Sequence, residues 1–322
     1  MKRKKDWVGA WFDLLANRGI QTDVLLGSCE GETNQITSFK RYSHSQFDGV
    51  GVFLDHYRNS GFAPTVPTLS KTFFGSWLSK IGGLIANLRF VPVFGAEWKQ
   101  MSDPFFGRGF ALKPDAKDLF VYRVLSKEIS QEIFTAAKSQ AVSINSQLMW
   151  SLDQTLRSNW KLHPEHFFWM VPVNMRGAIQ KQIDTSNHAS WIWVDTFKAQ
   201  KAAVIQNQIQ ARLNEGFHWG AWLGLNIGKL IGIKGMNFLL DKAAGIEEHW
   251  VGTFSNVGAW TIDGAGPVAI IIPTAPSTPL SAGCVTVNGN LGLSLHVHPQ
   301  LNVDEITLGS WIDSWVEKAK GL

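Results

Sequence analysis

The sequence predicts an α/β protein, because strand-like and helix-like segments follow one another along the chain. Residues 22–30 and 35–43 mix apolar, aromatic and hydroxyl side chains in the way that strands do. Residues 50–57 are apolar at helical spacing, which indicates a helix soon after the second strand. A strand-like run at 119–125 again precedes helical patterns. We therefore expect β-sheets that are covered by helices.

Other elements follow from the same patterns. Helices are predicted at residues 5–18, 75–90, 126–140 and 143–158. The turn sequence Gly-Glu-Thr-Asn separates the first two strands. A boundary between two parts of the chain is expected near residues 105–118, where glycine and proline cluster.

The composition is that of a globular protein with many aromatic side chains. Of 322 residues, 45% are hydrophobic and 17% are charged, and 15 Trp and 20 Phe are present. So many rings indicate a large aromatic core, an apolar substrate channel, or both. The net charge of +4 favours anionic ligands without identifying one. No basic run resembles a nucleic-acid motif, and the Lys and Arg residues at 2–5 are interpreted as a solvated terminus.

The sequence favours a cytoplasmic location, and membrane association stays open. Cys29 and Cys284 are far apart and show no metal-binding spacing, which is typical of a protein with reduced thiols. Asp6 and Asp13 interrupt the segment after the basic N-terminus, so a signal peptide is not predicted. No stretch is long and apolar enough to predict a transmembrane helix with confidence.

The residues between the second strand and its helix suit acid–base chemistry. His44 is followed at fixed spacing by Asp48 and Gly49. A histidine with a pKa of about 6.5 can take a proton near neutral pH. Gly49 suits a tight turn, and Asp48 can accept backbone N–H groups or pair with an arginine. His44 is therefore a candidate general base, the alternative being an ordinary structural histidine.

This His-x-x-x-Asp-Gly stretch resembles the motif of the chloramphenicol acetyltransferase-like superfamily of thioester-dependent acyltransferases. The superfamily includes plant BAHD enzymes, bacterial wax ester synthases and nonribosomal peptide condensation domains. Many members carry two adjacent histidines, whereas Ser43 stands before His44 here. Three later segments follow in the family order and most resemble wax ester synthase-like members. They are Pro172-Val173-Asn174-Met175-Arg176, Ser186-Asn187 and Ser255-Asn256-Val257-Gly258.

The resemblance implies two related halves, each a mixed β-sheet covered by helices, with a tunnel between them. Residues 1–107 would form a shortened N-terminal half that carries the His44 motif, and residues 108–322 the C-terminal half. Only 43 residues precede His44, considerably fewer than in two-domain relatives. A partner subunit is therefore one way to complete the tunnel walls.

The resemblance also implies roles for individual residues. His44 would take the proton from an acceptor hydroxyl or amine as it attacks the thioester of an acyl-CoA or an acyl-carrier protein. Asp48 would brace the turn against an arginine, for which Arg41 and Arg176 are the candidates. Ser255 and Asn256 either donate to the oxyanion of the tetrahedral intermediate or only shape a turn.

No permanently bound cofactor and no metal site are predicted. His296 and His298 alternate along a strand-like run and resemble a pair of metal ligands, but no third ligand is evident. The co-substrate would instead be the thioester itself, carried by coenzyme A or by phosphopantetheine on a carrier protein.

A glycine repeat within residues 205–244 is the least ordinary pattern of the chain. Glycine recurs at every fourth position from 216 to 232, on a predicted helix with an apolar stripe. We expect the glycine face to pack closely within the fold. An acyl-chain groove and a contact with a membrane surface are the alternatives, with Lys229 and Lys234 suited to anionic headgroups or a phosphate.

The function predicted is thioester-dependent acyl transfer in lipid or secondary metabolite biosynthesis. One alternative is a non-catalytic binding or scaffold subunit with the same fold, which the short front half keeps open. Another is amide formation on carrier-bound substrates, against which the missing second histidine counts.

Overall fold

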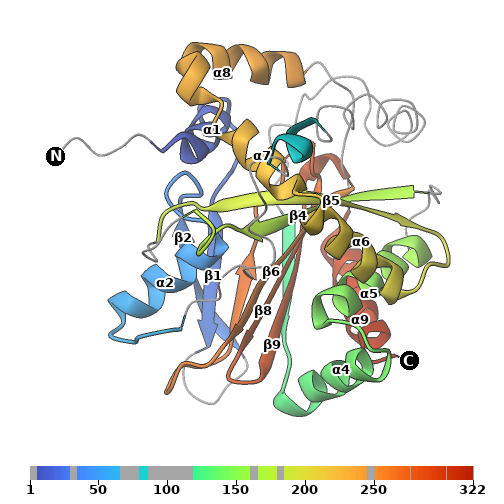
Figure 1. Ribbon diagram of the computed structural model, residues 1–322. Coiled ribbons are helices and arrows are strands. Elements are labelled where there is room, and N and C mark those ends of the chain that lie inside the picture. Colours follow the sequence, from blue (N-terminus) through green and yellow to red (C-terminus); the bar gives the residue numbers. More distant parts are fainter. Residues whose placement is uncertain are drawn as a thin grey trace.

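Two β-sheets form the centre of the protein, shown in a computed structural model (Figure 1). Residues 6–29, 35–65, 80–85, 119–159, 166–179, 185–244, 251–275, 277–301 and 303–321 are described. An antiparallel sheet has the strand order β2 (Ile36–Tyr42), β1 (Val24–Cys29), β7 (Val268–Ile271). A larger mixed sheet has the order β3 (Leu119–Val124), β9 (Asn290–Val297), β8 (Leu280–Val287), β6 (Gly252–Trp260), β4 (His166–Asn174), β5 (Ala189–Phe197).

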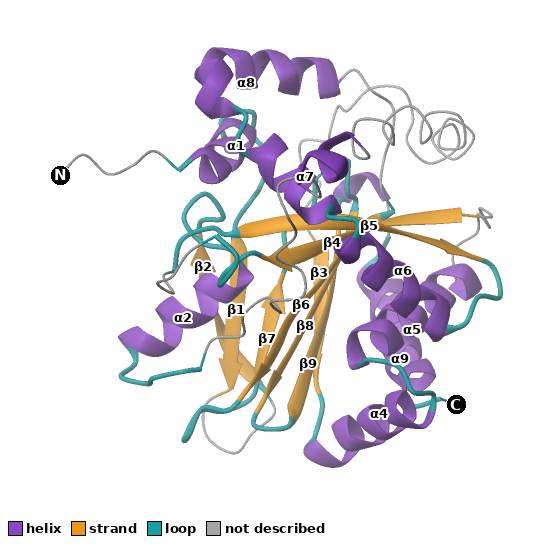
Figure 2. Cartoon of the chain, viewed as in Figure 1, coloured by secondary structure: helices purple, strands orange, loops and turns teal. Residues whose placement is uncertain are grey.

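Helices cover these sheets on separate sides, as Figure 2 shows. The labelled helices are α1 (Trp7–Ala16), α2 (Gly49–Asn59), α4 (Lys127–Ser139), α5 (Ile144–Asn159), α6 (Ala202–Asn214), α7 (Phe217–Leu225), α8 (Gly228–Ala244) and α9 (Glu305–Ala319), with a 3₁₀ turn at Pro299–Leu301. Helices α4, α5, α6 and α9 gather beside the large sheet, α2 lies near the small sheet, and α1 and α8 lie together at one end (Figure 2).

The two sheets are joined through β7. This strand pairs with β1, yet it also crosses the face of β8 and β9. A Cβ atom on Gly283 or Gly292 would overlap with a backbone carbonyl oxygen of β7, so glycine lets the two backbones meet. The hydroxyl of Ser294 donates to the carbonyl of Ile270 at 2.6 Å. Strands β8 and β9 are therefore covered on both faces, which explains their almost continuous burial.

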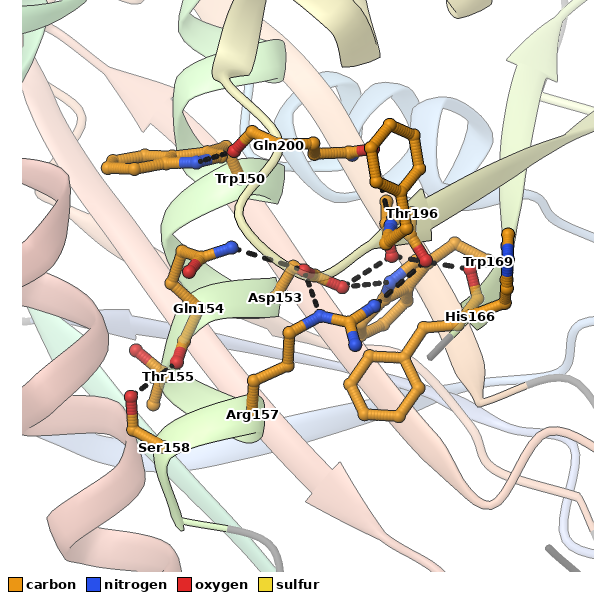
Figure 3. A network of polar contacts seen from close by, with 12 residues as sticks. Trp150, Asp153, Gln154, Thr155, Arg157, Ser158, His166, Trp169, Thr196 and Gln200 are labelled. Atoms are coloured by element: carbon orange, nitrogen blue, oxygen red, sulfur yellow. Dashed lines mark hydrogen bonds and ion pairs between the residues drawn. The ribbon is translucent and has the colours of Figure 1, made fainter. Parts of the chain in front are cut away.

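A buried ion pair holds α5 against the large sheet. Asp153 on α5 accepts from Arg157 at 2.8 Å and from the hydroxyl of Thr196 on β5, while the indole of Trp169 on β4 lies 3.4 Å away (Figure 3). Arg157 also donates to the carbonyl of Thr196 at 2.8 Å. Burial raises the pKa of Asp153, and Arg157 with these hydrogen bonds opposes that rise. Helix α5 is thus fixed to two strands by polar contacts within an apolar core.

The predicted fold class is confirmed, since helices cover β-sheets throughout the described chain. Most predicted elements agree with the structure, and residues 80–85 are the described part of the helix predicted at 75–90. The Ser255–Gly258 segment, for which a turn was one of the two expected roles, lies within β6. The predicted division into 1–107 and 108–322 stays a prediction, because its boundary lies outside the described residues. Strand β7 nevertheless shows that the later part of the chain completes the small sheet.

The glycine-rich segment is helical as predicted, but it forms two helices, and only part of its glycine face packs closely. Gly216 and Gly232 adopt positive φ, at 79° and 65°, and so begin α7 and kink α8. Gly220 packs against the backbone of Gly83, and Gly228 packs against Trp7 and Met236. Among the described residues, no atom beyond the adjoining backbone of its own helix lies within 4 Å of the Cβ position of Gly224, so this position faces open space. The repeat therefore combines two backbone breaks, two close contacts and one open site.

We predict opposite effects for two substitutions in this repeat. Gly228→Leu should lower the free energy of unfolding by about 1–3 kcal/mol, because the side chain would overpack against the Trp7 ring. Gly224→Leu should leave stability unchanged or raise it by up to about 1 kcal/mol, since leucine favours the helix. Denaturant unfolding of both variants checks this. Equal losses in both would contradict the packing described here.

Candidate active site

The motif loop links the end of β2 to the start of α2. The carbonyl of Ser43 accepts the backbone N–H groups of Gln46 and Phe47, both at 3.0 Å, which closes a turn after His44. Asp48 ends the turn as the N-cap of α2, and its Oδ1 accepts the N–H of Gly51 at 2.7 Å. This short polar sequence therefore places His44 one turn before a helix N-terminus.

Asp48 is buried, and its second carboxylate oxygen joins the motif loop to the large sheet. Asp48 Oδ2 accepts from Arg176 Nη1 at 2.8 Å and from the backbone N–H of His188 at 2.8 Å. The exposed fraction of Arg176 is 0%. Of the two arginines considered from the sequence, Arg176 is thus the partner of Asp48. Arg41 instead pairs with Asp23 at 3.2 Å on the surface.

Arg176 also draws two further segments to the loop. It follows β4 directly, and its Nη1 donates to the side-chain carbonyl of Asn174 at 3.1 Å. Its Nη2 donates to the carbonyl of Ser186 at 2.6 Å, just before β5. The structure therefore brings the Pro-Val-Asn-x-Arg and Ser-Asn segments together around Asp48, although more than a hundred residues separate them from it in sequence.

The imidazole of His44 is held in one tautomer. Its Nδ1 lies 2.8 Å from the carbonyl oxygen of Phe47, and a carbonyl can only accept. Nδ1 therefore carries the hydrogen, and Nε2 keeps its lone pair. The amide nitrogen of Asn187 donates to the backbone carbonyl of His44 at 2.8 Å and lies 3.2 Å from Nδ1. Asn187 thus steadies the histidine from the side of the large sheet.

Helix α1 covers one face of this imidazole. The ring of Phe12 stacks on His44 with a centroid separation of 4.0 Å and an interplanar angle of 23°. A Cβ on Gly9 would overlap with the carbonyl of Ser45, so α1 rests directly on the motif loop. The Trp11 indole donates to the carbonyl of Leu225 at 2.8 Å and ties α1 to the end of α7. Sequence reasoning missed Phe12, because nothing in its spacing relates it to the motif.

Burial lowers the pKa of His44 below its ordinary value of 6.5, and the Phe47 carbonyl and the charge of Asp48 oppose that effect. Although part of the residue's surface remains exposed, protein atoms surround the imidazole closely. The neutral form therefore predominates at pH 7. With Nδ1 engaged, neutral His44 can accept a proton at Nε2.

Ser255 and Asn256 lie on β6. The register of β6 against β8 shifts after Asn256, and Gly258 has a φ of 97°, so the strand carries a bulge. The side-chain oxygen of Asn256 accepts the N–H of Gly258 at 2.9 Å and shapes this bulge. Val257 packs against Gly49, and a Cβ atom added to Gly49 would lie 3.0 Å from a methyl group of Val257. The late Ser-Asn-x-x-Gly segment thus contacts the motif.

His296 lies on β9 and has a structural position, and His298 directly follows this strand. His296 Nδ1 donates to the carbonyl of Ile272 at 2.8 Å, beyond the end of β7. Among the described residues, no group of three or more metal-binding side chains could hold an ion. Both thiols, Cys29 and Cys284, are buried, and burial raises the pKa of each.

Two surface hollows lie elsewhere. One, of about 620 Å³, is lined by α4 and residues Lys320 and Gly321 after α9. The other, of about 650 Å³, is lined by α4, Trp260, Thr261 and Thr286, among others. Neither is lined by the motif residues, and the tunnel between the halves stays a prediction.

The described fold is similar to that of solved condensation domains and of an acetyltransferase. No protein-family model matches the sequence, and no curated protein matches it. Several solved structures, however, are similar to this protein in fold. The first condensation domain of the CDA synthetase is 13% identical with a TM-score of 0.52, and the match covers 88% of this chain and 62% of that one.

Two further structures agree. A condensation domain that mediates chain release from the enacyloxin polyketide synthase is 12% identical with a TM-score of 0.52, covering 87% of this chain and 56% of that one. A trichothecene 15-O-acetyltransferase from Fusarium sporotrichioides is 14% identical with a TM-score of 0.50, covering 99% of this chain and 75% of that one. The chain thus spans less than two thirds of the two condensation-domain structures, and at these identities the likeness shows the fold.

We predict that the ion pairs Arg176–Asp48 and Arg41–Asp23 differ widely in their contribution to stability. Arg176→Gln should lower the free energy of unfolding by about 3–5 kcal/mol, because it leaves the buried Asp48 charge without its partner. Arg41→Gln should cost less than about 1 kcal/mol, because solvent screens that pair. Denaturant unfolding compares the variants. A loss for Arg176→Gln no larger than that for Arg41→Gln would contradict the assignment.

Proposed function

We propose that the protein is an acyltransferase that moves an acyl group from a thioester to a hydroxyl or an amine, with His44 as general base. The observation that carries the proposal is the geometry of His44. Its Nδ1 is held by the Phe47 carbonyl at 2.8 Å, which leaves Nε2 as a proton acceptor. The convergence of four family-like segments around Asp48 supports the same reading.

The proposed reaction needs no covalent enzyme intermediate. His44 Nε2 takes the proton from the acceptor O–H or N–H while the oxygen or nitrogen attacks the thioester carbonyl carbon. The tetrahedral intermediate then collapses, the C–S bond breaks, and the leaving sulfur receives the proton from His44. The products are an ester or amide and a free thiol, and the imidazole returns to its neutral form.

Other groups support this chemistry by position. The Phe12 ring covers one face of the imidazole, so the acceptor would approach the Nε2 edge. The Ser255 hydroxyl is the proposed donor to the oxyanion. For Asn256 we favour a structural role, since its side-chain oxygen already shapes the β6 bulge. Asp48, Gly49 and Arg176 would hold the loop without touching substrate.

The proposed donor is acyl-CoA or an acyl-carrier protein, and the enzyme would work in the cytoplasm without a resident cofactor or metal. We favour a specificity like that of wax ester synthases, because the sequence segments most resemble those members of the superfamily. Amide formation on a carrier is the second candidate, which the likeness to condensation domains favours.

A partner subunit would complete the tunnel. A scaffold subunit without activity is the remaining alternative.

The general-base assignment predicts a large and selective loss of activity. His44→Ala should slow transfer by about 10²–10⁴-fold while the fold stays intact, because only the proton acceptor is removed. His166→Ala is the control, since this histidine hydrogen-bonds to Asp195 away from the motif. The assay uses acyl-CoA and acyl-carrier thioesters with hydroxyl and amine acceptors. Full activity in His44→Ala would exclude the base, and binding without turnover in the parent would favour the scaffold.

The pH profile tests the environment of the base. Because burial lowers the pKa of His44, kcat/KM should fall with acid only below pH 6.5. Phe12→Ala admits water to the imidazole and should move this midpoint upward, toward 6.5, whereas Phe12→Leu should move it less. A parent midpoint above 6.5, or one unaffected by Phe12→Ala, would contradict the described packing.

A further inference from the structure

Helices α7 and α8 carry an apolar surface that the proposed chemistry does not use. Leu230 is 86% exposed, Leu223 41%, Ile231 39% and Leu239 38%. Leu230 has most of its surface in solvent, and several exposed apolar side chains on consecutive elements indicate an interaction surface. Figure 1 places α8 at the edge of the molecule, with α1 beneath it.

These side chains lie on consecutive segments, with Leu239 beyond the kink of α8 at Gly232. Backbone bonds from Asn226 to Trp222 and from Ile231 to Ile227 carry helical turns through the junction of α7 and α8. We call Leu223, Leu230, Ile231 and Leu239, with the neighbouring lysines Lys229 and Lys234, the α7–α8 surface.

The other side of α8 is already covered. Met236 is fully buried, and Ile233 and Leu240 pack with it against Leu14 and the tryptophans of α1. Arg18, just after α1, donates to Asp241 at 2.7 Å and so fixes α8 in place. Helix α8 therefore has one apolar side packed on the protein and a second one in solvent.

The charge on this surface is positive. Lys229 and Lys234 are exposed, and neither forms an ion pair with any residue that the structure describes. The nearby carboxylate of Asp241 is neutralised by Arg18. The net charge of the chain, +4, has the same sign. Exposed leucine and isoleucine beside lysines are the chemistry of a helix that lies in the headgroup region of an anionic bilayer.

We propose that the α7–α8 surface docks on an anionic phospholipid bilayer. The apolar side chains would enter the headgroup region, and Lys229 and Lys234 would lie against lipid phosphates. No helix in the described part of the chain is long and apolar enough to cross a membrane, so this contact is peripheral. A protein partner is less favoured, because interface centres exclude lysine whereas lipid headgroups attract it.

Vesicle sedimentation tests the proposal with the intact chain. The parent should bind phosphatidylcholine vesicles that contain phosphatidylglycerol, and it should bind pure phosphatidylcholine vesicles less tightly. Leu230→Ser should reduce binding at least several-fold. Ile306→Ser is the matched control and should bind like the parent, because Ile306 on α9 is also 86% exposed but stands alone.

A second pair of variants tests the charges. Lys229→Gln/Lys234→Gln should weaken binding to the anionic vesicles about 25-fold, at about fivefold per lysine. Lys127→Gln/Lys138→Gln removes two exposed lysines of α4 and should have little effect. The proposal is overturned if the parent binds neither vesicle, or if either control loses binding equally. It is also overturned if the parent ignores vesicles and forms a dimer that Leu230→Ser abolishes.

Discussion

The buried ion pair between Asp48 and Arg176 is the contact on which the site depends. It links the start of α2 to the turn that follows β4 at 2.8 Å, and both side chains are buried. Burying two charges is costly, and an apolar pair of similar volume is often as stable. What the pair supplies is position, because each of its hydrogen bonds fixes a different segment of the chain.

Those segments converge because Asp48 and Arg176 each form hydrogen bonds with more than one segment of the chain. The Asp48 carboxylate accepts from Gly51, Arg176 and His188, and thereby fixes the start of α2 against the start of β5. Arg176 reaches Ser186 as well, so that Asn187 comes to lie beside His44. The conformation of His44 is thus set by residues remote in sequence, while the turn itself supplies the Phe47 carbonyl that fixes its tautomer.

The sequence predicted the strand, turn and helix of the motif because each is encoded locally. The resemblance placed His44, Asp48 and Arg176 in one site, but it left Arg41 and Arg176 as alternatives. That choice depends on strand register, since the pairing of β1 with β2 places Arg41 beside Asp23, with which it pairs at the surface. The stacking of Phe12 on His44 could not be predicted, because a contact between two rings from distant segments leaves no spacing pattern in the sequence.

Long-range features were the least predictable. Nothing in the sequence of β7 distinguishes a strand that pairs with β1 while it crosses β8 and β9. The glycines of that crossing lie in apolar runs and gave no signal of their own. In the glycine repeat the regular spacing was misleading, because two of the positions break the helix through positive φ and one faces open space.

The central claim is that the Asp48-anchored turn presents neutral His44 with a free lone pair on Nε2. Nitrogen-15 NMR of the histidine side chains at pH 7 tests this directly, with the His44 signals assigned by their loss in His44→Gln. The account predicts a hydrogen on Nδ1 and none on Nε2. A hydrogen on Nε2, or a doubly protonated ring at that pH, would contradict it.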